Sequence, residues 1–419
     1  MIYRRSYLLL LLLATLLIIG CASAGKEIVV SDLNSVSQLP KGDKKLWDMS
    51  RYEENTLTKS GLIYTDPAVS KYLQIIGERM IPPEYKNSIF KFRFYVILDP
   101  ELNAFALPNG AIYLHVGLLS KLEKPDQLAF ILGHEMTHSL RRHASRQYAH
   151  IQNVSGFAQF LSVATAVGFS QSGSNMTGFW NSLAQNGLAL TAMAAVSGYS
   201  RSDEKEADLN ALDLMEKAGY DKIQAVRSLE ILLEEYPDKS TTANFFYGNH
   251  PLTKQRLGYI EETIGYKGEE LKPEIDSTYE QAVSRLKLKN VELFVISSKY
   301  DKALKQASRI EVNYSGDPTF HYWCGEAYRL SGSKPDTLQL AQDQYQKALD
   351  LDSSFALAHL GLAQVWEARK DKNEALTHYE TYLIMDPQTK KKRYIESKIK
   401  SLKQEPIPQT PETNKKQEG

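Results

Sequence analysis

The stretch "LGHEMTHSLRRH", residues 132–143, restricts the fold most, because it places two histidines four residues apart with a glutamate beside the first. In an α-helix, positions four apart differ by about 40° around the axis, so His134 and His138 point the same way and can bind one metal ion. Glu135 lies about 60° from His138 on the same side, within reach of a water molecule on that ion. A chance match to HExxH has a probability of roughly one per cent in a chain of this length, so we expect a metal site on a helix.

A catalytic zinc ion needs a third protein ligand and an open position for water. The metzincin arrangement would require glycine and histidine where Arg141 and Ala144 stand, so that arrangement is excluded. On a continuous helix His143 lies about 140° from His138, and we therefore expect His143, like His150, to be structural. The third ligand must come from another part of the chain.

A second predicted helix, "YSRSDEKEADLNALDL" at residues 199–214, offers that ligand. Glu204 and Asp208 are four apart on one face, so Glu204 is placed to bind zinc while Asp208 accepts a hydrogen bond from a ligand histidine; Glu206 points elsewhere. On spacing alone, a solvated charged helix face is the better explanation of ExxxD. With Glu204 as ligand, zinc would keep a net charge near plus one and polarise its water, so that Glu135 takes the proton at neutral pH.

The N-terminus predicts export from the cytoplasm. Arg4 and Arg5 precede an apolar run at residues 8–19, which is too short to span a bilayer comfortably. A positive start followed by such a run is typical of a signal peptide, here residues 1–20.

Cys21 follows that segment and matches the lipobox of bacterial lipoproteins, with ordinary cleavage after Ala24 as the alternative. We expect a lipidated N-terminus and linker over residues 21–45. Acyl chains would tether the mature protein to a membrane, and Ala22 favours the outer membrane. Because Cys324 is the only other cysteine, a lipidated Cys21 excludes an intramolecular disulfide.

Periodicity divides the remaining chain. Asp66 and Pro67 predict a helix start, and short aromatic and β-branched runs between residues 91 and 116 predict a small antiparallel sheet. A long helix is expected over residues 125–150. The apolar pieces within residues 156–198 are shorter than a transmembrane helix, so this segment is expected to form buried helices or a lid near the site, with membrane insertion as the alternative.

A 34-residue period marks the C-terminal part. It resembles the tetratricopeptide repeat and predicts an all-α domain over residues 275–404, with a basic capping helix near 390–403 and a disordered tail at 405–419. The recurring positions are Ala341, Tyr345 and Ala348, followed by Ala375, Tyr379 and Tyr382.

Four segments occur in the order of one known family: "NAFALPNG", HExxH, "SRSDEKEAD" and "HPLTKQR". Together they resemble the HtpX-like and prenyl-protease-like zinc metallopeptidases, and most closely the periplasmic branch that carries tetratricopeptide repeats and assists β-barrel assembly. The resemblance implies an α+β, mostly α, zincin-type peptidase domain at residues 46–270, followed by the all-α repeats.

The resemblance also implies roles for individual residues. His134, His138 and Glu204 would bind one zinc ion per chain, and Glu135 would act as general base and then acid. Asp208 would orient a ligand histidine and pair with Arg256. Asn103 corresponds to an asparagine that contacts substrate, and the strand it begins could pair with an extended peptide. His250 would either block the water position or stabilise the oxyanion.

The expected function is a zinc-dependent endopeptidase of the cell envelope that degrades misfolded or misassembled outer-membrane proteins. The repeats would dock substrate or the β-barrel assembly machinery, in a periplasmic protein tethered through Cys21. The alternative is a chaperone or adaptor that works through its repeats and keeps a latent peptidase site. Fifty basic and fifty acidic residues give no net charge, so no nucleic-acid partner is expected.

Overall fold

A computed structural model describes residues 32–147, 199–235, 254–268, 271, 274–332 and 335–404. Several predictions lie outside these residues: the signal peptide, the lipidated Cys21, the segment 156–198, His150, His250 and the C-terminal tail. Among the described helices, none is both long and apolar enough to cross a bilayer.

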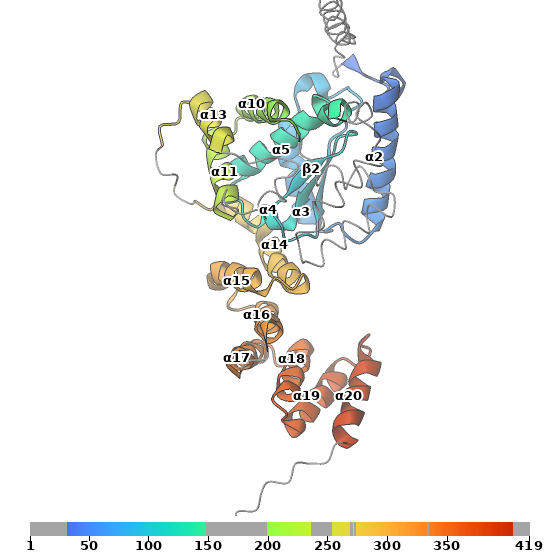
Figure 1. Cartoon of the computed structure of the whole chain (residues 1–419), viewed down its shortest axis with the longest axis vertical. Helices are drawn as coiled ribbons and strands as arrows, with labels where there is room; N and C mark the ends of the chain where they lie inside the picture. The colour runs from blue at the N-terminus through green and yellow to red at the C-terminus, as the bar shows by residue number, and fades with distance from the viewer. Residues whose placement is uncertain are drawn as a thin grey trace, which may run out of the picture.

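The peptidase region begins with helical segments, of which α2 (Lys41–Lys59) lies along one side of this region (Figure 1). A 3-10 turn, η2 (Val36–Gln38), precedes α2 (Lys41–Lys59) and α3 (Pro67–Met80), and a second 3-10 turn, η3 (Pro83–Tyr85), follows them. The predicted start of α3 is confirmed, because the Asp66 carboxylate accepts hydrogen bonds from the backbone N–H groups of Ala68 and Val69. The apolar stripe of α3 is buried: Val69, Leu73, Ile76 and Met80.

The sheet has three strands, β1 (Arg93–Ile97), β2 (Ala104–Ala106) and β3 (Ala111–His115), in the order β1-β3-β2. β2 and β3 form the predicted antiparallel pair, but β1 runs parallel to β3, so the expectation of a purely antiparallel sheet was wrong. The connection between β1 and β2 carries the chain past β3, which leaves β2 at one edge. The period of a strand predicts its existence and not its neighbours.

The helices around the site form one core with this sheet. They are α4 (Val116–Leu119), α5 (Pro125–Leu140), α10 (Arg201–Lys217), α11 (Ile223–Glu235) and α13 (Lys254–Ile264). The expected helix over residues 125–150 is shorter than predicted: α5 ends at Leu140, and Arg142 has a φ of 56°. A non-glycine residue with positive φ interrupts a right-handed helix, so the next helical turn, at residues 143–147, takes a new direction.

Antiparallel helices descend from the peptidase region towards the C-terminus as a column (Figure 1). They are α14 (Ser277–Ile296), α15 (Tyr300–Tyr314), α16 (Pro318–Ser331), α17 (Pro335–Leu351), α18 (Ala356–Ala368), α19 (Lys372–Met385) and α20 (Lys392–Gln404). The helix α14 joins the two regions, because Tyr279, Val283 and Leu286 belong to the peptidase core while Phe294 belongs to the first repeat core. At the far end, Ile395 of α20 packs on α19.

Candidate metal centre

The helix α5 is buried along almost its whole length, which is why both of its histidines lie inside the protein. His134 and His138 are 4% and 1% exposed, and their Nε2 atoms are 3.0 Å apart. Glu135, beside them on the same helix, is 2% exposed. Histidine and glutamate are rarely buried this fully unless they bind a partner or an ion, so the helix carries a polar site within an apolar core.

A second helix brings the carboxylate. The Ser200 hydroxyl caps α10 by accepting from the backbone N–H of Asp203, and the helix then crosses α5 at Gly133. A Cβ atom on Gly133 would lie only 3.1 Å from the Cα atom of Ala211, so glycine permits this close approach. The crossing places Glu204, which is 2% exposed, against the two histidines.

The two Nε2 atoms and the two carboxylate oxygens of Glu204 have distances close to those between the ligands of a zinc ion. The Glu204 oxygens lie 3.6 Å from Nε2 of His134 and 3.6 Å from Nε2 of His138. A tetrahedral ion with bonds of about 2.1 Å separates its ligand atoms by about 3.4 Å. The described residues that can converge on one ion include this buried group of His134, His138 and Glu204, so the predicted residues fit a single divalent metal.

Asp208 contacts His134 at the ring nitrogen that faces away from the ligand cluster. Its carboxylate lies 2.9 Å from Nδ1 of His134, and Arg256 of α13 donates to both carboxylate oxygens, at 2.8 and 2.6 Å. Arg256 also forms an ion pair with Glu204 at 3.0 Å. Burial opposes ionisation of Asp208, but the charge of Arg256 and the hydrogen bond with His134 outweigh it and hold the pKa of Asp208 well below its usual range. The structure thus places the predicted pair Asp208 and Arg256 together.

Three further residues at the site were not predicted. The Tyr259 hydroxyl donates to Asp208, and Tyr259 lies one turn after Arg256, a spacing that the sequence shows. Tyr199 stacks on His138 with ring centroids 3.9 Å apart, and burial together with the charges of Glu135 and Glu204 raises its pKa, so it stays protonated. His143 contacts His138 through their Nδ1 atoms at 2.7 Å. The turn at Arg142 causes this contact, and no local sequence pattern predicts that turn.

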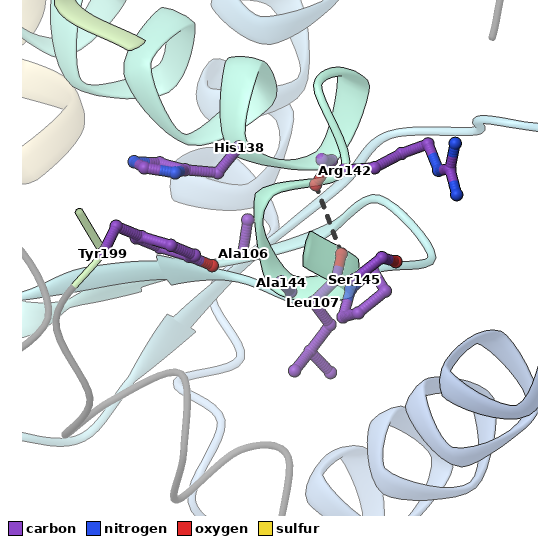
Figure 2. Close-up of a pocket in the computed structure, with 9 residues that line it drawn as sticks. Ala106, Leu107, His138, Arg142, Ala144, Ser145 and Tyr199 are labelled. Carbon is purple, nitrogen blue, oxygen red and sulfur yellow. Dashed lines mark hydrogen bonds between the residues drawn. The ribbon is translucent and has the colours of Figure 1, made fainter. Parts of the chain in front are cut away.

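A small cavity opens beside His138, towards the end of β2 (Figure 2). The Tyr199 ring lies along one side, and the other side includes Ala106, the last residue of β2, and Leu107, which follows it. The hydroxyl of Ser139 donates to the backbone carbonyl of Leu107 at 3.2 Å, which fixes the end of β2 against α5.

Asn103 stands immediately before β2, at the edge of the sheet nearest this helix. Its backbone carbonyl accepts a hydrogen bond from the N–H of His115 in β3 at 2.9 Å. Within the described sheet, β2 is an edge strand and pairs with β3. The pairing of β2 with an extended peptide, which the family resemblance implies, stays a prediction.

Comparison with known proteins gives matches in two parts of the chain. The family model "Peptidase family M48" matches residues 67–264, and a tetratricopeptide-repeat model matches residues 337–389. The beta-barrel assembly-enhancing protease of Escherichia coli (strain K12) is 28% identical over 214 residues, which covers 50% of this chain and 42% of that protein.

Two other relatives come from different organisms. A putative beta-barrel assembly-enhancing protease of Vibrio cholerae is 27% identical over 46% of this chain and 39% of its own length. The mitochondrial metalloendopeptidase OMA1 of Schizosaccharomyces pombe is 28% identical over 47% of this chain and 59% of its own length. The match spans less than half of both bacterial relatives. Residues 67–264 of this chain are a peptidase family M48 domain, and tetratricopeptide repeats follow it.

Proposed function

We propose that the chain is a zinc-dependent endopeptidase of the cell envelope. One observation carries the proposal: the ligand atoms of His134, His138 and Glu204 converge at the spacing of a tetrahedral ion, next to the buried Glu135. Names of relatives from both bacteria and mitochondria include protease or metalloendopeptidase, which supports the same reaction class.

In this mechanism each residue has a separate task. His134, His138 and Glu204 would hold the zinc ion, which would supply Lewis-acid chemistry by lowering the pKa of a water molecule and polarising the scissile carbonyl. Glu135 removes a proton from the attacking water and later delivers it to the leaving amine. Asp208 fixes the His134 ring so that Nε2 faces the ligand cluster, and Arg256 keeps Asp208 ionised and in place.

Substrate contacts are assigned to the sheet edge, and a role at the site is assigned to His250. The edge strand β2 binds an extended stretch of peptide through main-chain hydrogen bonds, with Asn103 contacting it near the scissile bond. Such binding accepts many sequences, which suits an enzyme that acts on unfolded chains. His250 either closes the site or stabilises the oxyanion. Its replacement by alanine raises peptidase activity in the first case and lowers it in the second.

The proposed location is the periplasmic face of the outer membrane, with lipid on Cys21 as the tether. The proposed substrates are unfolded or misassembled envelope polypeptides. The relatives named for β-barrel assembly support this choice, and the repeats supply a docking surface for substrate or assembly machinery.

The direct test measures zinc and proteolysis in the purified chain lacking its signal peptide. Wild type should hold one zinc ion by mass spectrometry and cleave an unfolded protein such as casein, with loss of cleavage in a chelator. Glu204→Ala should lose most of the zinc, because one of three protein ligands is gone. Glu135→Gln should keep the zinc but lower the rate by about 10²-fold or more. Equal zinc in wild type and Glu204→Ala would exclude Glu204 as a ligand.

The same Glu135→Gln variant separates the peptidase from the adaptor alternative in cells. If proteolysis is the function, a strain carrying this variant shows the envelope defect of a strain without the protein. Retention of normal envelope assembly would instead assign the main function to the repeats.

A further inference from the structure

A chain of hydrogen bonds leads from the second ligand histidine to the protein surface. Nδ1 of His138 lies 2.7 Å from Nδ1 of His143, and Nε2 of His143 lies 3.2 Å from a carboxylate oxygen of Glu206. His143 is completely buried, whereas Glu206 is partly exposed and accepts a hydrogen bond from Arg146 at 3.1 Å. This series of hydrogen bonds begins at His138 in the ligand cluster and ends at the pair of Glu206 and Arg146.

The direction of these hydrogen bonds follows from the chemistry at both ends. A neutral imidazole carries one proton, so two nitrogens 2.7 Å apart require one donor and one acceptor. The carboxylate of Glu206 can only accept, which places the His143 proton on Nε2 and leaves Nδ1 as an acceptor. His138 must then donate from Nδ1, and its Nε2 carries the lone pair that faces His134 and Glu204.

The opposite arrangement is unfavourable at each step. If His143 donated from Nδ1, its Nε2 lone pair would face the Glu206 carboxylate. The proton of His138 would move to Nε2, where it would point into the ligand cluster and prevent metal binding. The surface carboxylate therefore determines which nitrogen of a buried histidine is available, through His143.

We propose that His143 is a positioning residue for the metal: it holds His138 in the tautomer and ring orientation that direct Nε2 at the ion. This inference rests on the proposed zinc site. It makes the two ligand histidines unlike each other, because His134 is held by the charged Asp208 whereas His138 is held by a neutral ring. A neutral acceptor orients the imidazole without adding another negative charge to the centre.

The same residues also form a possible second ligand group: His143, Asp203 and Glu206. Arg146 argues against a second ion, because its guanidinium bonds Asp203 at 2.5 Å and Glu206 at 3.1 Å. The guanidinium of Arg146 already supplies a positive charge to Asp203 and Glu206. These carboxylates instead orient His143, through the contact of Glu206 with its Nε2 atom.

The test uses the zinc affinity of the full chain, measured by competition with a chromophoric chelator at constant pH. His143→Leu keeps an apolar side chain of similar length but removes the acceptor, and zinc should bind about 10–100-fold more weakly. His143→Asn places an amide oxygen near the position of Nδ1, and its affinity should stay within about threefold of wild type. Such rescue by asparagine separates hydrogen bonding from packing. An affinity of His143→Leu equal to that of wild type would overturn the proposal.

A second measurement does not depend on the leucine variant. In zinc-loaded wild-type protein labelled with ¹⁵N-histidine, two-bond ¹⁵N–¹H correlation spectra report which ring nitrogen carries each proton. His138 should be protonated at Nδ1 and His143 at Nε2, with the His143 signals assigned by their loss in His143→Asn. A His143 ring protonated at Nδ1 would refute the proposal even if the leucine variant did not fold. A wild-type chain that binds no zinc would refute the proposed function as well, whereas normal wild-type binding with the wrong tautomer would refute this inference alone.

Discussion

The peptidase region and the repeats are both mainly helical, but they are stabilised in different ways. The peptidase core joins residues as distant as Leu33 and Leu293 and surrounds a group of buried charges. Each repeat core instead draws on a short stretch of chain, such as Tyr322 to Val365. Long-range packing positions the three candidate metal ligands, whereas short-range packing builds the column of repeat helices. A destabilising substitution should therefore lower metal affinity only when it lies in the peptidase region.

The largest effect is expected from Asp208→Asn. The substitution leaves Arg256 buried without its main carboxylate partner, and unfolding should become easier by about 3–5 kcal/mol, measured by chemical denaturation. Zinc affinity should fall by about 10–100-fold, since His134 loses its charged acceptor. Asp213→Asn is the matched control on the same helix, because Asp213 is half exposed and pairs only with Lys217 in the described structure. Equal losses in the two variants would contradict this assignment.

Gly361→Val should damage the repeats and leave the metal centre intact. Tyr345 of α17 inserts between Gly325 of α16 and Gly361 of α18, and a Cβ atom on Gly361 would lie 2.4 Å from its ring. The fully buried ring has no room to move, so we expect a loss of about 2–3 kcal/mol in the free energy of unfolding. Zinc affinity should equal that of wild type. The control, Gly316→Ala, adds its Cβ atom to open space.

Gly133→Val makes the same chemical change in the peptidase region. The contact across Gly133 is looser, because the flexible end of Met80 lies at 3.0 Å and Ala211 at 3.1 Å, so the stability loss should be about 1–2 kcal/mol. Zinc affinity should nevertheless fall, by about tenfold, because α10 carries Glu204 and would move away from α5. Gly42→Val in α2, where a side chain meets open space, should leave zinc affinity unchanged. A normal zinc affinity in Gly133→Val would show that the helix crossing does not determine the ligand geometry.

The same contrast explains how far the sequence alone could predict the structure. The repeat positions Tyr345 and Tyr379 and the cap at Asp66 were predicted correctly, because a period or a cap depends on neighbours within a few residues. Glu204 and Asp208 could be proposed as a pair because they share one helix face, but their convergence with His134 depends on a helix crossing that involves Gly133.

Two errors have the same physical origin. The parallel pairing of β1 with β3 depends on the path of the connection between β1 and β2, which periodicity does not describe. The contact between His143 and His138 was missed because the predicted helix continued through Arg142. The φ of 56° at Arg142 turns the next residues back towards His138. Tertiary contacts select such a conformation, so a helical projection of the sequence placed His143 on the wrong side.

The smallest expected effect is a pH dependence of stability caused by a histidine pair in the repeats. His378 of α19 and His359 of α18 lie with their Nδ1 atoms 2.9 Å apart. Burial, with a smaller contribution from the charge of His359, lowers the pKa of His378 to about 4 from its usual value of 6.5. Between these two values the unfolded chain binds a proton at His378 that the folded chain does not, so stability is complete above pH 6.5 and declines as the pH falls towards 4.

Because His378 is only partly buried, this decline should be modest, about 2–4 °C in the thermal midpoint. His378→Gln keeps a polar side chain that cannot take up the proton, so its midpoint should change less between pH 7 and pH 4.5 than that of wild type. Scanning calorimetry of both chains across this range makes the comparison, with zinc affinity at pH 7 expected to be the same in both. An identical pH dependence in the two proteins would show that His378 does not contribute to the loss of stability at low pH. Other titrating groups would then cause that loss.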